Sequence, residues 1–435
     1  MFGGGNFQTM NKELPGAYIN VVSVKKAAGA VSDRGYASMP MELDWGKDGE
    51  MITLTNEILQ KDARKLFGYA YTAPELADIR DVFCHATTLY LYRLNSGGEK
   101  ASNDYCTAVC SGTRGNSLKV VIAQDVDSDS QYVVKLYMTD TADGQSVDVK
   151  LDEQTVAAAS DLENNDYVEW KSGAALTVTA GVSLSGGSNA SVTGDSHSAY
   201  LAALEPYYIN TFGVKTADET VKKLYVSYVK RMRDEVGSKF QLILHNYAGD
   251  YEGVINVKNS VKAVPWVVGA EAGCNVEKSC TNMTYDGEAD VPADYTQIEL
   301  KAAMKAGEFV FHKVGEQIRV LSDINSLLTY TEDKSKDFAS NQVIRVVDQI
   351  ATDIASIYVS RYIGKYNNNA TNRTALWKDI TGEHEVLAKK GAIDDYDSKD
   401  VEVTAHETDK KAVVVTDQVQ PAEAMEKLYM TIIVR

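Results

Sequence analysis

The carboxyl end of the chain carries the feature that most restricts its fold. The run KLYMTIIV, residues 427–434, is apolar on both faces of an extended strand and stops one residue before Arg435. Its β-branched and aromatic residues favour a strand, and such a strand left as an open edge promotes aggregation. The residues alone leave two outcomes open: burial within the chain's own fold, or addition to a sheet in another subunit by β-augmentation.

A second strand raises the same question near the amino end. Residues 17–24, AYINVVSV, are rich in β-branched residues, follow about fifteen residues without periodicity, and precede the small-residue stretch KKAAGA. Two exchangeable strands at opposite ends of one chain indicate head-to-tail contacts between copies. Such contacts propagate as helical arrays unless they close into rings.

Length and charge limit the class of protein. A chain of 435 residues is too long for one ordinary core, so two or three domains are expected. A net charge of -17 argues against broad nucleic-acid binding, which depends on clustered Lys and Arg. We find no signal peptide and no apolar run long enough for a transmembrane helix. Five cysteines in so long a chain indicate no disulfide framework, and synthesis in a reducing cytoplasm is expected.

The amino-terminal third predicts a mixed α/β unit. Residues 36–43 and 88–94 are expected strands. Residues 55–68 predict a helix with Thr55 as N-cap and Gly68 as C-cap, and a second helix follows Pro74. From about residue 104 to 187, short alternating runs rich in Thr, Val and Ser predict an inserted β-rich module.

Helices return after the insertion, with YLAALEPYYINTF (200–212) among them, followed by an apolar strand at 239–247. Residues 337–364 show the strongest periodicity of the chain. There the apolar residues recur at spacings of three and four, which predicts an amphipathic helix: Val343, Val347, Ile350, Ile354 and Ile357. Strands are expected at 401–407 and 411–419. The fold class is thus α+β and multidomain, a mixed α/β core with an inserted β-rich domain and strand-forming arms at both ends.

No motif predicts catalysis, a cofactor or a bound metal. The acids at 125–129 lack the later residues of a calcium loop. The pairs Cys106–Cys110 and Cys274–Cys280 lack zinc-ligand spacing, so ordinary small or buried cysteines are expected. His384 and Glu385 begin like a zinc-protease motif, but no second histidine follows at the required spacing, so both are expected on the surface of a helix. We therefore expect a protein that is not an enzyme.

Several segments resemble one family. They are LPGAYINVVS near the start, DYEGVINV at 250–257, INSLLTYTEDKSKDFASNQVIRVVDQI at 324–350, DIASIYVSRYIGKYNNNATNRTALW at 353–377, and AMEKLYMTIIVR at the end. The chain resembles the tail sheath proteins of contractile phages, above all the branch from defective prophages and phage-tail-like bacteriocins of Gram-positive bacteria. Residues 105–187 resemble the family least, as expected for its variable inserted domain.

The resemblance implies hexameric rings stacked helically around an inner tube, whose contraction pushes the tube through a cell envelope. It also implies arms that add strands to sheets of neighbouring subunits, with receiving strands near 401–419. The residues expected in the arm strands are Tyr18, Ile19, Val21, Val22, Leu428, Tyr429, Met430, Ile432, Ile433 and Val434. The expected hinge is Ala27, Ala28, Gly29 and Ala30.

We expect six segments along the chain: an amino-terminal arm (1–30), a core domain in two parts (31–103 and 188–295), the inserted domain (104–187), an inner domain (296–422) and a carboxyl-terminal arm (423–435). The expected partners are further copies of the chain, the inner tube protein, and baseplate and tail terminator proteins, with neither nucleic acid nor direct membrane insertion. Assembly is expected in the bacterial cytoplasm, before the subunit becomes part of a virion tail or a released particle. The alternative is another structural component of a contractile injection machine, such as a tube or baseplate protein.

Overall fold

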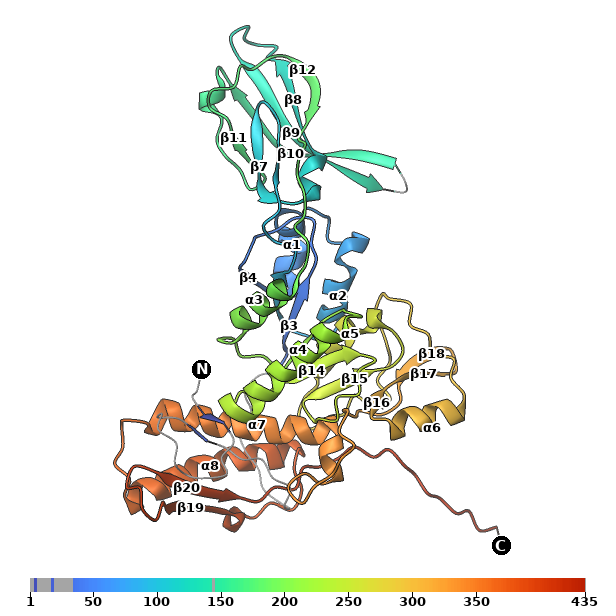
Figure 1. The fold of residues 1–435 in the computed structure, drawn as a ribbon, viewed down its shortest axis with the longest axis vertical. Coiled ribbons are helices and arrows are strands. Elements are labelled where there is room, and N and C mark those ends of the chain that lie inside the picture. The colour runs from blue at the N-terminus through green and yellow to red at the C-terminus, as the bar shows by residue number, and fades with distance from the viewer. Residues whose placement is uncertain (1–3, 6–16, 19–33, 143–144, 435) are drawn as a thin grey trace. The chain divides into compact units, whose positions relative to one another are not determined.

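The computed structural model describes residues 4–5, 17–18, 34–142 and 145–434 (Figure 1). The chain divides into two compact units. The first unit comprises Met1–Ser38, Asp78–Thr88 and Glu205–Arg435, and the second unit comprises Met39–Ala77 and Leu89–Leu204. The predicted mixed α/β fold class is confirmed, whereas the six-segment division stays a prediction.

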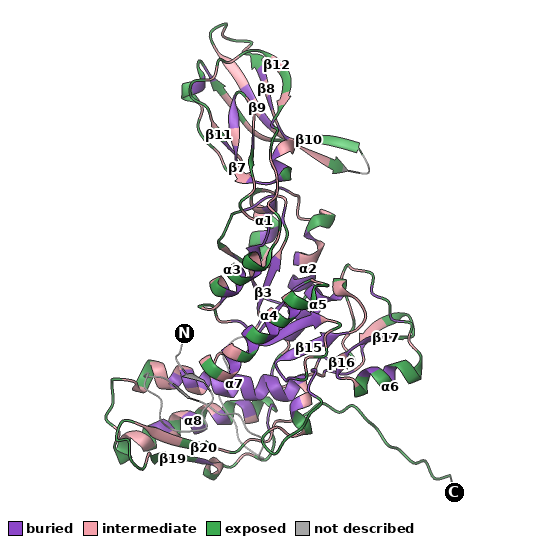
Figure 2. Ribbon diagram, in the orientation of Figure 1, coloured by how far each residue is buried: buried purple, intermediate pink, exposed green. Residues whose placement is uncertain are grey.

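The first unit is built on parallel strands in the order β16-β15-β14-β13-β3. Strands β14 and β15 are buried almost throughout (Figure 2), which is typical of parallel sheets covered on both faces. The strands are β3 (Tyr36–Met41), β13 (Thr211–Gly213), β14 (Gln241–His245), β15 (Val254–Val257) and β16 (Glu308–Phe309). The helices before the carboxyl-terminal region are α2 (Ala77–Phe83), α4 (Glu219–Lys230), α5 (Val264–Gly273) and α6 (Gln297–Lys305).

The carboxyl-terminal part of the first unit contains two long helices and a β-ribbon. Helix α7 (Asn341–Ile357) continues into a π-helical turn at Tyr358–Tyr362, and α8 (Ala370–Lys390) follows. Strands β19 (Val401–Ala405) and β20 (Val413–Asp417) pair antiparallel. A hairpin of β17 (Phe311–Val314) and β18 (Gln317–Val320) lies earlier in the chain. Helix α7 falls within the periodic segment 337–364, and β19 and β20 fall within the strands predicted at 401–407 and 411–419.

The second unit holds the β-rich segment. One antiparallel sheet has the order β10-β9-β8-β12 and a smaller one β11-β7-β6, and buried residues such as Leu118, Leu136 and Val168 form one core. The strands are β4 (Met51–Leu54), β5 (Thr88–Arg93), β6 (Lys100–Ser102), β7 (Cys106–Ser111), β8 (Leu118–Gln124), β9 (Tyr132–Ala142), β10 (Gln145–Val156), β11 (Val168–Trp170) and β12 (Thr179–Ser183). The helices of this unit are α1 (Asn56–Phe67) and α3 (Gly194–Leu204).

Local sequence rules account for the ends of helix α1. Thr55 accepts a hydrogen bond from the Ile58 amide, and Gly68 adopts a left-handed backbone with φ of 76°. Both predicted caps are confirmed. The helix predicted over 200–212 is wrong beyond Leu204, because α3 ends there and Thr211–Gly213 form β13. The residue before a proline disfavours the helical conformation, and Pro206 follows Glu205 directly.

Arg93 forms hydrogen bonds with residues close to both ends of the β-rich segment. Its buried guanidinium donates to the carbonyls of Gly46 and Ser111, both at 3.0 Å, and pairs with Asp48 at 3.1 Å. It also donates to the Asn189 side chain at 3.3 Å. Ser111 lies near the start of the segment and Asn189 just after its end, so a single side chain contacts residues close to both ends of the segment.

Candidate assembly site

The carboxyl-terminal arm, defined here as residues 427–434, is exposed and makes no strand within its own chain. Leu428 is 85% exposed, Tyr429 90% and Ile433 80%. Figure 1 shows this segment running away from the rest of the first unit. Burying an apolar side chain of this size contributes about 1.5–3 kcal/mol. Burial of six such side chains would contribute on the order of 10 kcal/mol before the costs of ordering. Because these side chains are exposed, the arm is not buried within its own fold.

The residues just before the arm are fixed. The amide of Ala422 donates to the Ala392 carbonyl at 2.9 Å, and the amide of Ala424 donates to the Gln342 side chain at 3.0 Å. The Glu426 carboxylate accepts from the Thr281 hydroxyl at 2.6 Å. The arm therefore starts from a defined point on the first unit, directly after Glu426.

The β19–β20 ribbon offers a partner for such a strand. Within the described residues its sheet has two strands, so each strand has an outer edge that no ladder occupies. Its inner face packs on α8, where the Trp377 indole donates to the Val401 carbonyl at 2.9 Å. The cover is incomplete, since Val415 is 36% exposed although it stands opposite the half-buried Val403. An isolated two-stranded sheet is marginally stable, and further strands would complete it.

An open groove lies beside β19. It has a volume of about 260 Å³ and is lined by Ala370, Arg373, Thr374 and Trp377 of α8 and by Val403 of β19. Its walls combine the Trp377 indole and the Val403 side chain with the polar side chains of Arg373 and Thr374. Such a surface can receive both apolar and polar side chains of an added strand.

A buried histidine and a carboxylate connect α8 to the end of β20. His384 Nε2 lies 3.1 Å from one oxygen of Asp417 and 3.2 Å from the other. Burial lowers the pKa of His384 to about 3, and burial together with the Asp400 charge raises the pKa of Asp417 to about 7. At pH 7 the histidine is therefore neutral and the Asp417 carboxyl is about half ionised. Sequence reasoning placed His384 on a helix surface, but it is fully buried.

The amino-terminal residues are described only in part. Ala17 and Tyr18 form β2, which pairs in parallel with β1 (Gly4–Gly5). Ile19, Val21 and Val22, and the expected hinge at Ala27, Ala28, Gly29 and Ala30, lie outside the described residues.

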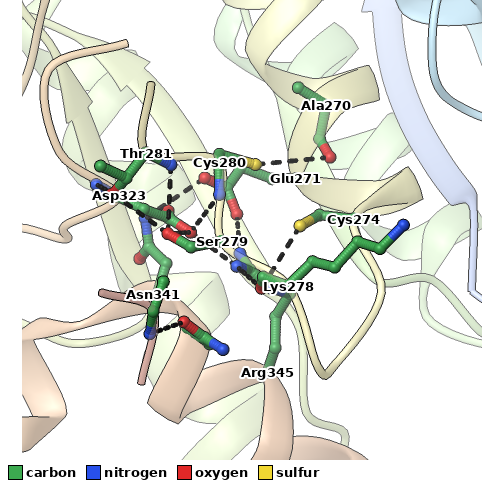
Figure 3. A network of polar contacts seen from close by, with 12 residues as sticks. Ala270, Glu271, Cys274, Lys278, Ser279, Cys280, Thr281, Asp323, Asn341 and Arg345 are labelled. Atoms are coloured by element: carbon green, nitrogen blue, oxygen red, sulfur yellow. Dashed lines mark hydrogen bonds and ion pairs between the residues drawn. The ribbon is translucent and has the colours of Figure 1, made fainter. Parts of the chain in front are cut away.

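A buried polar network fixes α7 against α5 (Figure 3). Arg345 is 1% exposed, forms an ion pair with Glu271 of α5 and another with Asp323 at 2.6 Å, and donates to the Lys278 carbonyl at 3.0 Å. Further along α7, Asp348 accepts from Arg233 at 2.8 Å. The apolar stripe predicted for this helix is confirmed at its four buried members, Val343, Val347, Ile350 and Ile357. The sequence analysis did not predict that the polar face of α7 is also buried, although charged residues within so apolar a helix indicate it.

The network contains a possible ligand set, because oxygens of Glu271 and Asp323 and the Cys280 sulfur lie within 4.8 Å of one another. Arg345 already supplies positive charge to both carboxylates. Burial acts to raise the pKa of Asp323, but Arg345 and hydrogen bonds outweigh it and hold the value at about 2. Burial and the neighbouring Asp323 charge raise the pKa of Glu271 well above its usual value. The Arg345 guanidinium therefore already provides the counter-charge for these two buried carboxyl groups.

No helix among the described residues is both long enough and apolar enough to cross a membrane. The comparisons with known proteins agree along the chain. Residues 34–94 match the family described as tail sheath protein Gp18 domain III N-terminal region, residues 190–326 the phage tail sheath protein central domain, and residues 333–435 the phage tail sheath C-terminal domain.

Full-length relatives show the same likeness. The phage-like element PBSX protein XkdK of Bacillus subtilis is 29% identical over 474 residues, which cover 99% of both chains. The crystal structure of a sheath tail protein from Desulfitobacterium hafniense has a TM-score of 0.82 at 36% identity and covers 95% of this chain and 99% of that one.

A more distant likeness concerns the fold alone. The helical sheath of the anti-feeding prophage in its contracted state has a TM-score of 0.53 at 14% identity, with 97% of this chain and 99% of that chain covered. Together, the three matched domains and the full-length likeness to a solved sheath protein show that this chain belongs to the phage tail sheath protein family.

Proposed function

We propose that this chain is the sheath subunit of a contractile tail, and that it polymerises as stacked hexameric rings around an inner tube. Contraction of this lattice drives the tube through the envelope of a target cell. The observation that carries the proposal is the pairing of two features in one chain: an exposed apolar arm with a fixed base, and a ribbon whose outer edges pair with no other strand among the described residues.

In this proposal, residues 427–434 of one subunit add a strand to the β19–β20 ribbon of a neighbour. The amino-terminal residues Tyr18, Ile19, Val21 and Val22 act in the same way at another contact. Backbone hydrogen bonds give such a junction its strength, and apolar side chains such as Leu428, Met430 and Ile432 complete the half-covered face of the ribbon. Because donor and acceptor are different surfaces, each copy binds the next and the contact propagates.

Contraction needs subunits that move as rigid bodies while their connections persist. The buried ion pairs of α7 support the first requirement, since they fix that helix to α5 and to Arg233. The arm supports the second, because Glu426 is held and the residues after it are exposed. The extended lattice is then a kinetically trapped state that gains new lateral contacts on contraction. Residues 27–30 are proposed as the hinge of the amino-terminal arm.

The proposed partners are further copies of the chain, the inner tube protein, and baseplate and tail terminator proteins. We place residues 296–422 toward the tube and the inserted segment 104–187 outside, following the family resemblance. Assembly takes place in the bacterial cytoplasm, and the product is a virion tail or a released phage-tail-like particle. The net charge of -17 makes nucleic acid an unsuitable partner.

The test is a chain truncated after Glu426, compared with the full chain by negative-stain electron microscopy and by thermal unfolding. The full chain should form helical tubes. The truncated chain should keep its unfolding midpoint but stay unassembled, because the lost residues make no strand in their own subunit. The matched control is Val126→Ser, which removes an apolar side chain that is 94% exposed in the inserted segment and should leave tubes unchanged. Normal tubes from the truncated chain would rule out the proposed arm.

A further inference from the structure

Two cysteines converge on the end of helix α5, beside the Arg345 network. Cys274 ends that helix, where its amide donates to the Ala270 carbonyl at 2.9 Å. The thiol of Cys280 donates to the same carbonyl at 3.8 Å. Figure 3 shows both sulfur atoms in this small region, between α5 and the loop that follows it. From these contacts we propose that Cys274 and Cys280 are a redox site that forms a reversible disulfide within one subunit.

The loop between the two cysteines is held in a fixed shape. Its Lys278 carbonyl accepts from Arg345 at 3.0 Å, and the Cys280 amide donates to Asp323 at 2.9 Å. The Cys274 thiol donates to the Lys278 carbonyl at 3.6 Å. Seven residues from Cys274 to Cys280 therefore fold back so that both ends meet. This holds the two sulfurs near each other before any bond forms.

The two thiols differ in exposure and in charge environment, as an attacking and a resolving cysteine must. Cys274 is partly exposed, and the Arg34 guanidinium donates to its carbonyl at 2.8 Å. The hydrogen bond from Cys280 lowers the pKa of Cys274 to about 7, with Arg345 contributing in the same direction. Cys280 is buried, and its pKa is raised. Cys274 is thus the thiol that is both accessible and partly ionised near neutral pH.

The reaction needs an oxidant, and a small-molecule disulfide such as oxidised glutathione supplies it. The Cys274 thiolate attacks one sulfur of that disulfide, whose S–S bond breaks, and one thiol leaves. The Cys280 thiol then loses its proton, and its sulfur attacks the Cys274 sulfur of the mixed disulfide, releasing the second thiol. Two protein thiols are oxidised and one disulfide is reduced to two thiols.

The remaining cysteines provide controls within the same chain. Cys106 and Cys110 lie four residues apart on strand β7, which separates them by about 13 Å along the strand. That distance exceeds the roughly 7 Å between Cα atoms that a disulfide tolerates. Desolvation of the Cys84 thiol, together with the nearby charges of Asp286 and Asp81, raises its pKa to about 12. Neither the pair on β7 nor Cys84 should form a bond within the subunit.

The experiment treats the purified full chain with oxidised glutathione, blocks free thiols with iodoacetamide, and maps tryptic peptides without reduction. Trypsin cuts after Lys278, so Cys274 and Cys280 fall in separate peptides, 263–278 and 279–301. We expect these two peptides to be joined, and to separate after treatment with dithiothreitol. The peptide 101–114, which holds Cys106 and Cys110, should carry two blocked thiols.

Two variants make the assignment specific. Cys280→Ser should leave glutathione attached to Cys274, because the resolving thiol is missing. Cys274→Ser should leave Cys280 in peptide 279–301 free of glutathione and blocked only by iodoacetamide. Circular dichroism verifies that each variant folds. Should Cys280→Ser fail to fold, the wild-type peptide map and Cys274→Ser still decide. Recovery of both wild-type peptides with blocked thiols, or glutathione on Cys280 rather than Cys274, would overturn the proposal.

Discussion

Replacing Arg345 by methionine tests whether the network around α7 holds the first unit together. The substitution keeps a long side chain in the cavity but removes both ion pairs, to Glu271 and to Asp323. Asp323 is then an ionised carboxylate buried without its counter-charge, a situation that costs about 3–5 kcal/mol. We expect a loss of unfolding free energy of that order, because the side chain is 1% exposed and water cannot take the place of the guanidinium.

The assay is urea unfolding followed by amide hydrogen exchange and mass spectrometry, which reports on the two units separately. Peptides from α5 and α7 should lose protection at lower urea in Arg345→Met, while peptides from β8 and β9 in the second unit should not change. Arg231→Met is the matched control. That residue pairs with Glu205 at 2.6 Å with its side chain 42% exposed, and exposed pairs contribute about 1 kcal/mol or less.

A double variant separates the free energy of the lost ion pairs from the cost of leaving the Asp323 charge unpaired. Asp323→Asn removes the carboxylate that Arg345→Met leaves behind, and its amide oxygen can still accept from the Cys280 amide. The combined variant should therefore be less destabilised than the sum of the two single changes. A loss below 1 kcal/mol for Arg345→Met, or strict additivity in the double variant, would refute the reasoning.

Three further outcomes follow from the structure. Ile433→Asp should prevent tube formation without lowering the unfolding midpoint, whereas Val126→Asp should leave both the tubes and the midpoint unchanged, as electron microscopy and calorimetry would show. Asp417→Asn should gain stability relative to the natural chain as the pH rises from 5 to 8. Folding raises the pKa of the Asp417 carboxyl from 3.8 to about 7. The stability that this carboxyl contributes to the natural chain is therefore fully present below pH 3.8 and is lost as the pH rises through 7. Parallel curves of midpoint against pH would contradict that assignment. Gly112→Ala should cost about 2 kcal/mol or more in the second unit, since its φ is +123° and a Cβ would lie 2.0 Å from the Asp44 carbonyl, while Gly173→Ala, with open space around it, should be neutral in urea unfolding.

Sequence patterns predicted those features of the fold that depend on residues close together in the chain. The caps at Thr55 and Gly68 depend on neighbouring backbone atoms, so their side chains suffice to place α1. The stripe containing Val343 and Val347 depends on one helical period. The arm's apolar pattern also marked it as a strand former, but pattern alone could not decide where its partner lies.

The unpredicted features depend on contacts between distant residues. Arg345 meets Glu271 across 74 positions and Asp323 across 22. No local sequence pattern indicates that these three side chains are buried together. His384 is a similar case, because its partner Asp417 belongs to a strand 33 residues away. Burial of such groups is decided by which elements pack together, and periodicity reports only that a face is apolar.

The Arg93 junction has a consequence for how such a gene can vary. The Arg93 guanidinium, which precedes the β-rich segment, contacts Ser111 near the start of the segment and Asn189 just after its end. The rest of the chain is therefore joined to this segment at two closely spaced points, whatever is folded between them. Recombination can replace the intervening module, and an engineer can graft a foreign domain there, provided that its termini lie equally close together.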